Sequence, residues 1–116
     1  MKKVLIIEDD IEFQNKFKEL LWDKIELLQA RTLEEAKRIL VFYWEELDYI
    51  CLDFYLDKAN YNITSVELTL EIKQRFKKVI MIAISSHEES RETQRMLGCK
   101  LESTKDNLPE LILSII

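Results

Sequence analysis

The sequence predicts one α/β domain in which helices cover both faces of a parallel sheet. Short apolar runs typical of buried strands alternate with stretches whose apolar residues recur every three or four positions, the period of a helix. The chain has 116 residues, enough for one core, and its single Gly and single Pro leave little room for flexible segments. Five β units alternating with five α units imply a parallel sheet, because parallel strands need helical crossovers.

Five strands are expected from the apolar runs. Residues 4–7 and 49–52 are hydrophobic throughout, as in strands that are buried on both faces. The expected strands are 3–8, 25–30, 48–53 and 79–85, with a fifth near 100–104.

The first two helices carry recognisable start signals. Asp10 can cap a helix over 11–22, because its side chain can accept a hydrogen bond from an N–H of the first turn. Thr32 and Glu35 form a capping box at the start of the second helix. The residues expected to be buried are Phe13, Phe17, Leu20 and Leu21 in the first helix and Ala36, Ile39, Leu40 and Tyr43 in the second.

The remaining three helices follow the third, fourth and fifth strands. Thr64 and Glu67 form the pattern of a second capping box. The helix that follows it has apolar residues at a four-residue spacing, Leu68, Ile72 and Phe76. A polar helix is expected near 88–97. The last helix is expected to begin at Asn107, because Asn is a common cap and Pro109 suits the first turn of a helix.

Composition argues against several classes of partner. The formal net charge is -5, whereas nucleic-acid and anionic-membrane surfaces need an excess of Lys and Arg. No apolar run approaches the roughly 20 residues of a membrane span, and residues 1–3 lead into a strand rather than a signal peptide. Cys51 and Cys99 are far apart and lack metal-ligand spacing. We therefore expect a cytoplasmic protein with protein partners, as a monomer or a weak homodimer.

Acidic residues stand where two core strands end. Glu8, Asp9 and Asp10 follow the first strand, and Asp53 follows the third. Neighbouring strands lie about 4.8 Å apart, so acids at their carboxyl ends converge at one edge of the sheet. Carboxylates crowded in this way repel one another and raise each other's pKa, and a hard divalent cation with oxygen ligands resolves the repulsion. Parallel sheets bind ligands at this edge, where Ser85 also falls.

Four motifs, in order and at strand ends, make the chain resemble the receiver domain of two-component response regulators over essentially its whole length. The matching stretches are residues 3–10, 48–53, 82–86 and 98–105, and Asp53 and Lys105 stand 52 residues apart. The resemblance implies a flavodoxin-like (βα)5 fold with strand order 2-1-3-4-5. Residues 1–116 would form a single receiver domain without an output domain.

The resemblance also implies a role for each strand-end residue. Asp53 would accept a phosphoryl group, Lys105 and Ser85 would contact its oxygens, and His87 would modulate its loss. The ligands of Mg²⁺ would be Glu8 through a water, Asp9, Asp53 and the backbone carbonyl of Tyr55. A sensor histidine kinase or a histidine phosphotransfer protein would be the donor, and the output would be contact with another protein or phosphorelay. Such a protein is a phosphoacceptor that assists its own reactions rather than an enzyme.

Some positions depart from the usual receiver pattern. The loop after Asp53 lacks the usual Pro and Gly, and Glu102 stands where receivers have an aromatic switch residue. Counting back from Gly98 places Ala83 where receivers have the residue whose hydroxyl contacts the phosphoryl group. The polar residues that follow the apolar core of the fourth strand favour Ser85 instead. These departures leave open a second hypothesis, a pseudo-receiver that is not phosphorylated and acts as a protein-interaction module.

A third hypothesis is an enzyme on the same architecture. Phosphohydrolases and nucleases of the haloacid-dehalogenase and Toprim types need an Asp-x-Asp pair after a strand, which residues 53–55 lack. An FMN site would place phosphate beside the acids at 8–10, which would repel it.

Overall fold

The computed structural model describes residues 1–57 and 59–116, in which five strands alternate with five helices. The elements are β1 (Lys3–Ile7), α1 (Ile11–Leu21), β2 (Glu26–Ala30), α2 (Leu33–Tyr43), β3 (Tyr49–Leu52), α3 (Val66–Arg75), β4 (Ile80–Ala83), α4 (Glu88–Leu97), β5 (Leu101–Glu102) and α5 (Leu108–Ile115). Every expected element is present, and the strands are shorter than predicted.

All neighbouring strands of the sheet are parallel, in the order β2-β1-β3-β4-β5, as expected. Val4 of the central strand pairs with Leu27 on one side and Tyr49 on the other. The predicted strand over 100–104 was too long, because β5 pairs only at Leu101 and Glu102. As an edge strand, β5 has a hydrogen-bonding neighbour on one side alone.

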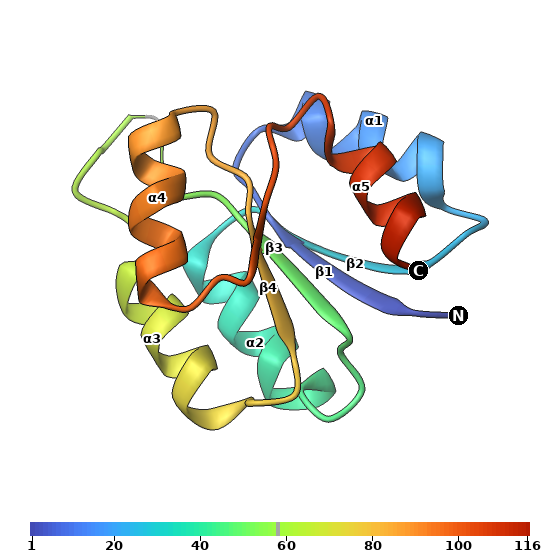
Figure 1. Cartoon of the computed structure of the whole chain (residues 1–116), viewed down its shortest axis with the longest axis horizontal. Coiled ribbons are helices and arrows are strands. Elements are labelled where there is room, and N and C mark those ends of the chain that lie inside the picture. The colour runs from blue at the N-terminus through green and yellow to red at the C-terminus, as the bar shows by residue number, and fades with distance from the viewer. Residues whose placement is uncertain (58) are drawn as a thin grey trace.

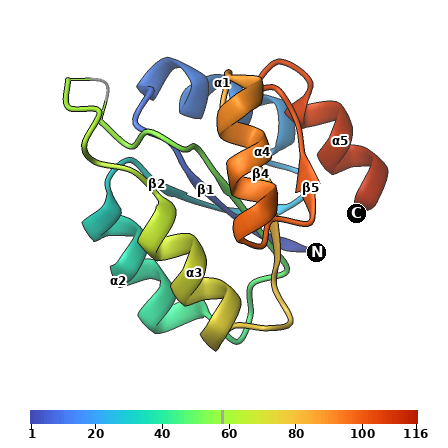
Figure 2. The same ribbon diagram turned by 60° about the vertical axis from the view of Figure 1, so that its left-hand side comes forward.

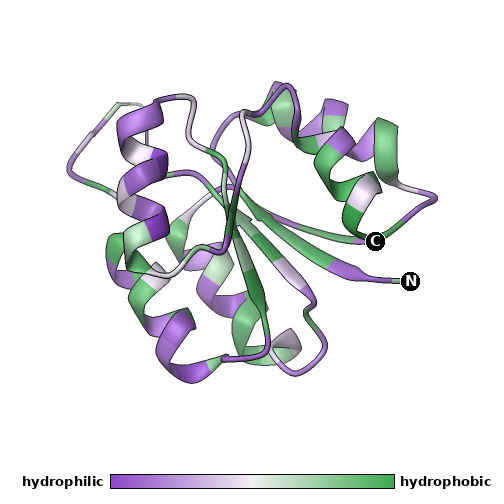
Figure 3. Cartoon of the chain, in the orientation of Figure 1, coloured by the Kyte–Doolittle hydropathy of each residue, from purple (hydrophilic) through white to green (hydrophobic). Residues whose placement is uncertain are grey.

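Helices cover both faces of this sheet, so its central strands are buried. Figures 1 and 2 show α1 and α5 together on one face and α2, α3 and α4 on the other. Residues 4–7 of β1 have no exposed surface, as expected for a strand covered on both sides. In Figure 3 the strands are mostly hydrophobic, whereas α4 is mostly hydrophilic. No helix in the described ranges has both the length and the apolar character needed to cross a membrane.

Two of the four predicted helix caps are confirmed. Asp10 accepts hydrogen bonds from the backbone N–H groups of Glu12 and Phe13, and Thr32 accepts one from Glu35. The capping box predicted at 64–67 is wrong, because the helix begins after Ser65, which forms no side-chain cap. The Asn107 side chain likewise forms no cap, although Pro109 lies in the first turn as expected.

Two of the helix residues predicted to be buried lie at the surface. Leu20 is 48% exposed and Tyr43 is 36% exposed. On α1 the buried face instead includes Gln14, which is 2% exposed among Phe17 and Leu21. A polar side chain therefore takes a core position directly beneath the edge of the sheet where the acids lie.

Candidate functional site

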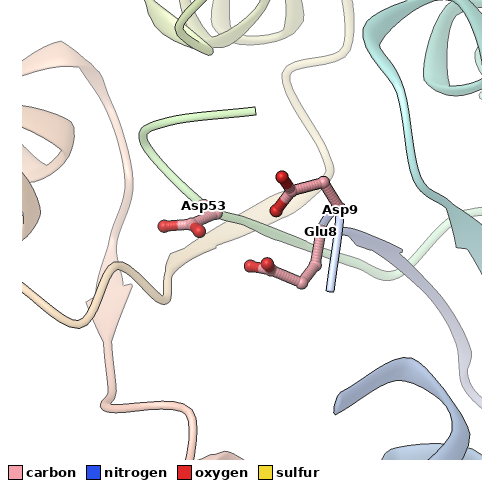
Figure 4. Close-up of side chains that lie close together, drawn as sticks. All are labelled: Glu8, Asp9 and Asp53. Carbon is pink, nitrogen blue, oxygen red and sulfur yellow. The ribbon is translucent and has the colours of Figure 1, made fainter. Parts of the chain in front are cut away.

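Three acidic side chains meet at the carboxyl ends of β1 and β3. Glu8 and Asp9 follow β1 and Asp53 follows β3, and these two strands are hydrogen-bonded neighbours. Figure 4 shows the three carboxylates side by side. One carboxylate oxygen from each residue lies within 4.8 Å of those of the other two. Glu8 has no exposed surface and Asp53 is 6% exposed, so water compensates little of their mutual repulsion.

Lys105 brings a positive charge into this acidic cluster. Its Nζ lies 2.9 Å from Oε2 of Glu8 and 3.0 Å from Oδ2 of Asp53. The lysine follows β5, so the fold joins residues from the two ends of the chain. The remaining carboxylate oxygens accept backbone N–H groups, Glu8 from Asp10 at 3.1 Å and Asp53 from Phe54 at 2.8 Å.

Burial and charge shift the pKa of two groups in the cluster. Burial raises the pKa of Glu8 to about 8, the negative charge of Asp53 adds to this, and Lys105 opposes it. Burial alone would lower the pKa of Lys105. The hydrogen bonds and negative charges of Glu8 and Asp53 raise it by more, so the pKa of the lysine lies above its ordinary value. The cluster thus holds at least one proton that an exposed carboxylate would have lost at neutral pH.

The donor set of the cluster fits a divalent cation. Oxygen atoms bound to one Ca²⁺ or Mg²⁺ lie roughly 2.0–2.6 Å from it, so two ligands of one ion can be up to about 5 Å apart. The carboxylate oxygens of Glu8, Asp9 and Asp53 meet this condition. Hard oxygen ligands without His or Cys favour Mg²⁺, Ca²⁺ or Mn²⁺ over softer metals.

Ser85 and His87 follow β4, which is the hydrogen-bonded neighbour of β3, the strand that Asp53 follows. Ser85 is 1% exposed, and its Oγ accepts the backbone N–H of His87 at 3.2 Å. Ala83, the other candidate for the hydroxyl position, is the last residue of β4 and lies in the core. His87 and Tyr55 line a hollow of about 710 Å³ together with Tyr61. The two residues thus lie in one neighbourhood, while the predicted roles of Tyr55 as a metal ligand and of His87 in phosphoryl loss stay predictions.

Two buried glutamines that the sequence analysis did not single out hold the strand ends in place. The amide of Gln14 donates to the carbonyls of Ile6, Glu8 and Ala30 at 3.0 to 3.3 Å. On the opposite face, Gln94 donates to the carbonyl of Leu52 at 2.8 Å. Gln14 could have been found as a polar residue on an apolar helix face, whereas Gln94 lies in a helix that is polar throughout.

An arginine and a glutamate attach α4 to the same edge of the sheet. Arg91 donates from Nη1 to the carbonyl of Ser85 at 2.8 Å and from Nε to Glu102 at 3.3 Å. Arg95 also pairs with Glu102, at 3.2 Å. At the position where the resemblance implied an aromatic switch residue, Glu102 thus joins β5 to two arginines of α4.

The loop after Asp53 is closed at its base. Tyr55 and Thr64 form an antiparallel bridge, and the N–H of Ser65 donates to the carbonyl of Phe54 at 2.8 Å. Leu56 is 3% exposed, and its N–H donates to the carbonyl of Ile63 at 3.0 Å. These bonds fix both ends of the loop beside the acidic cluster.

Comparison with known proteins identifies the fold. No family model and no curated protein sequence matches the chain. Among solved structures, a response regulator from Burkholderia pseudomallei with a phosphorylated aspartic acid and a calcium ion has a TM-score of 0.80 at 18% identity. The match covers 98% of this chain and 65% of that one.

Two further structures agree with this match. The Thermotoga maritima response regulator DrrB has a TM-score of 0.78 at 22% identity, over 98% of this chain and 50% of that one. The receiver domain of Ssk1 from Saccharomyces cerevisiae, in complex with the histidine phosphotransfer protein Ypd1, has a TM-score of 0.75 at 25% identity. That match covers 98% of this chain and 86% of that one. This chain thus spans about half to two thirds of the first two proteins. Its architecture is that of the receiver domains of response regulators.

Proposed function

We propose that this chain is a receiver that accepts a phosphoryl group on Asp53 from a histidine kinase or a histidine phosphotransfer protein. The observation that carries the proposal is the position of Lys105, whose ammonium lies 2.9 Å from Glu8 and 3.0 Å from Asp53 at the edge where the acids converge. A solvated surface lysine would not be expected in a buried pair of carboxylates.

In this proposal the reaction is a substitution at phosphorus. An oxygen of Asp53 forms a bond to phosphorus, the P–N bond of the donor phosphohistidine breaks, and its electron pair leaves on the imidazole nitrogen. Lys105 is a compact charge on a flexible stem, so it can exchange its carboxylate contact for a phosphoryl oxygen. Ser85 donates its hydroxyl to another of these oxygens, which stabilises the charge that collects there.

The acidic cluster would hold Mg²⁺ in this function. Its residues Glu8, Asp9 and Asp53, with the backbone carbonyl of Tyr55, are the proposed ligands. When bound, the cation supplies positive charge that lets an anionic carboxylate approach an anionic phosphoryl group. The calcium ion in the Burkholderia pseudomallei regulator supports the choice of a divalent cation.

The test is intact-mass spectrometry after incubation with acetyl phosphate and Mg²⁺. We expect one phosphoryl adduct on the wild type, none on Asp53→Asn, and an undiminished adduct on Asp23→Asn, which removes an exposed acid elsewhere. Labelling of Asp53→Asn at the wild-type level would contradict the assignment of the acceptor. Absence of an adduct together with failure to bind Mg²⁺ would instead favour a pseudo-receiver that acts by protein contact.

The metal ligands can be separated from the adjacent helix cap. Asp9→Ala should weaken Mg²⁺ binding at least about tenfold, since it removes a direct ligand, and Asp10→Ala should change it little, because Asp10 caps α1. Titration calorimetry measures both. Equal losses of affinity in the two variants would contradict the ligand assignment.

A further inference from the structure

A groove between α2 and α3 has no part in the proposed phosphoryl chemistry. Two hollows, of about 710 and 530 Å³, share the lining residues Trp44, Arg75 and Phe76 and are therefore adjacent. Figures 1 and 2 both show α2 and α3 lying side by side. We call the two adjacent hollows together the α2–α3 groove.

The floor of the α2–α3 groove is apolar and partly open to solvent. Trp44 stacks on Phe76 with ring centroids 5.4 Å apart and planes at 29°. Leu40 and Leu68 continue this floor between the two helices. Val41 is 72% exposed and Trp44 is 42% exposed. Large apolar side chains grouped in a hollow, rather than scattered singly, are typical of a surface that binds another molecule.

The edges of the groove are basic, although the chain as a whole is acidic. Four cations line it, Lys37, Arg75, Lys77 and Lys78, against two acids, Glu45 and Glu71. Glu71 is paired with Arg75 at 3.1 Å. The three lysines form no ion pair with any residue that the structure describes. In a chain of net charge -5, such a local excess of cations favours an acidic ligand.

We propose that the α2–α3 groove binds an amphipathic helix of a partner protein, one that carries apolar residues on one face and Asp or Glu beside them. Two helices of 11 and 10 residues flank the groove, so a partner helix of about three turns can lie along them with its apolar face on Trp44 and Phe76. Its carboxylates would then reach the lysines at the edges. A second copy of this chain fits less well, because a two-fold dimer through the groove brings the same cations together.

The stacked pair at the centre of the groove lies toward the amino ends of the strands, whereas the acidic cluster lies at their carboxyl ends. Trp44 and Phe76 directly follow α2 and α3 and precede β3 and β4, whereas Asp53 follows β3. The partner helix therefore binds without contact to Asp53. This separates the inference from the proposed function, since either can fail while the other holds.

The experiment is a selection of displayed 14-residue helical peptides on the intact chain. Enriched peptides should carry apolar residues at i, i+3 or i+4 and i+7, with an excess of Asp and Glu. The best peptide that lacks Trp is then titrated against Trp22→Phe, in which Trp44 is the remaining tryptophan and reports binding by its fluorescence. Trp22 is 67% exposed and directly follows α1, which covers the other face of the sheet (Figure 1), so its replacement should leave the groove unchanged.

Four variants decide the outcome, and the affinity of each is measured by titration calorimetry, because Trp44→Ala also removes the fluorescent reporter. Trp44→Ala and the double change Lys77→Glu/Lys78→Glu should each weaken binding about tenfold or more, because they remove an aromatic anchor or reverse the edge charge. The control Lys16→Glu/Lys18→Glu makes the same change in net charge on α1, and Asp53→Asn removes the phosphoacceptor; both should bind as the parent does. Enrichment of basic or uncharged peptides, equal losses in the two charge variants, or dimerisation through Trp44 would overturn the proposal.

Discussion

The two halves of the carboxyl edge of the sheet are held together by different kinds of contact. One half, which we call the acidic half, consists of Glu8, Asp9, Asp53 and Lys105. The other, the α4 half, consists of Ser85, Arg91, Gln94 and Glu102. In the acidic half the contacts between elements join side-chain charges, with Lys105 2.9 and 3.0 Å from two carboxylates. In the α4 half, besides the ion pairs of Glu102, Arg91 and Gln94 donate hydrogen bonds to backbone carbonyls.

The acidic half can therefore change its charge, whereas the α4 half fixes the position of α4 on the sheet. Ion pairs depend weakly on direction and respond to protons, metal ions and phosphate. Hydrogen bonds from an amide or a guanidinium to a carbonyl are directional, and neither donor gains or loses a proton near neutral pH. A phosphoryl group on Asp53 would therefore act first on the acidic half, and α4 would follow through Arg91 and Gln94.

The largest expected effect is from removal of the cation in the acidic half. Lys105→Met leaves Glu8 and Asp53 buried without a positive partner, and we expect it to lower the free energy of unfolding by ~2–3 kcal/mol at pH 7.5. Urea denaturation in the presence of EDTA measures this. The control Lys100→Met, at an exposed lysine, should cost less than about 0.5 kcal/mol. Equal effects would remove the basis for treating Lys105 as part of the cluster.

The second prediction concerns the pH dependence of stability. The pKa of Glu8 is raised from 4.5 to about 8, so the folded state keeps a proton that the unfolded state releases. Stability should therefore fall as pH rises from 4.5 to about 8, by at most about 1.4 kcal/mol per pH unit, the limit for one proton.

A matched pair of variants checks this dependence. Glu8→Gln removes the titrating group while keeping an oxygen for the N–H of Asp10, and its stability should vary less between pH 5 and 8 than that of the wild type. Glu19→Gln, at an exposed glutamate, should keep the wild-type profile. A profile for Glu8→Gln as steep as that of the wild type would place the titration elsewhere.

The third prediction tests the α4 half. Gln94→Leu removes the donor to the carbonyl of Leu52, and we expect a loss of ~1 kcal/mol, because that carbonyl keeps a second bond from the N–H of Ile84. Hydrogen exchange of the α4 amides should become faster in this variant. Gln74→Leu, on the exposed side of α3, should leave the exchange of α4 unchanged. No change in α4 exchange would mean that Gln94 fills space without holding the helix.

The last prediction concerns the coupling between Arg91 and Glu102. The Arg91 side chain is 13% exposed, so a double-mutant cycle with alanine at both positions should give a coupling energy of about 1 kcal/mol. The same cycle on Arg38 and Glu34, an exposed pair on α2 at 3.6 Å, should give about 0.3 kcal/mol. Similar coupling energies in the two cycles would show that the contact between α4 and β5 behaves as an ordinary surface pair.

The sequence analysis predicted the acidic half well because its residues are charged and lie next to apolar strands. Once β1 and β3 are recognised as neighbours, Glu8, Asp9 and Asp53 must meet, since the geometry of parallel strands leaves no other arrangement. The α4 half was not predicted in the same detail. Arg91 and Gln94 contact backbone carbonyls, and no sequence pattern records which carbonyl a side chain will reach.

The errors in the helices have local physical causes. The buried face of α1 includes Gln14 rather than Leu20, and the amide of Gln14 donates to three strand-end carbonyls. Tyr43 lies at the surface, with Nζ of Lys3 5.1 Å from the centre of its ring. The start of α3 is fixed by the backbone bond from Ser65 to Phe54 rather than by the predicted cap.

The closed base of the loop after Asp53 gives the chain a place to accept new sequence. The bridge between Tyr55 and Thr64 fixes where the loop leaves and rejoins the domain, so a change of length beyond the bridge should not move Asp53. Tyr61 of this loop is 68% exposed, and its ring centroid lies 5.1 Å from that of Tyr55. An epitope or a fluorophore-binding segment inserted after Asn60 would thus be held next to Asp53 by the closed base of the loop.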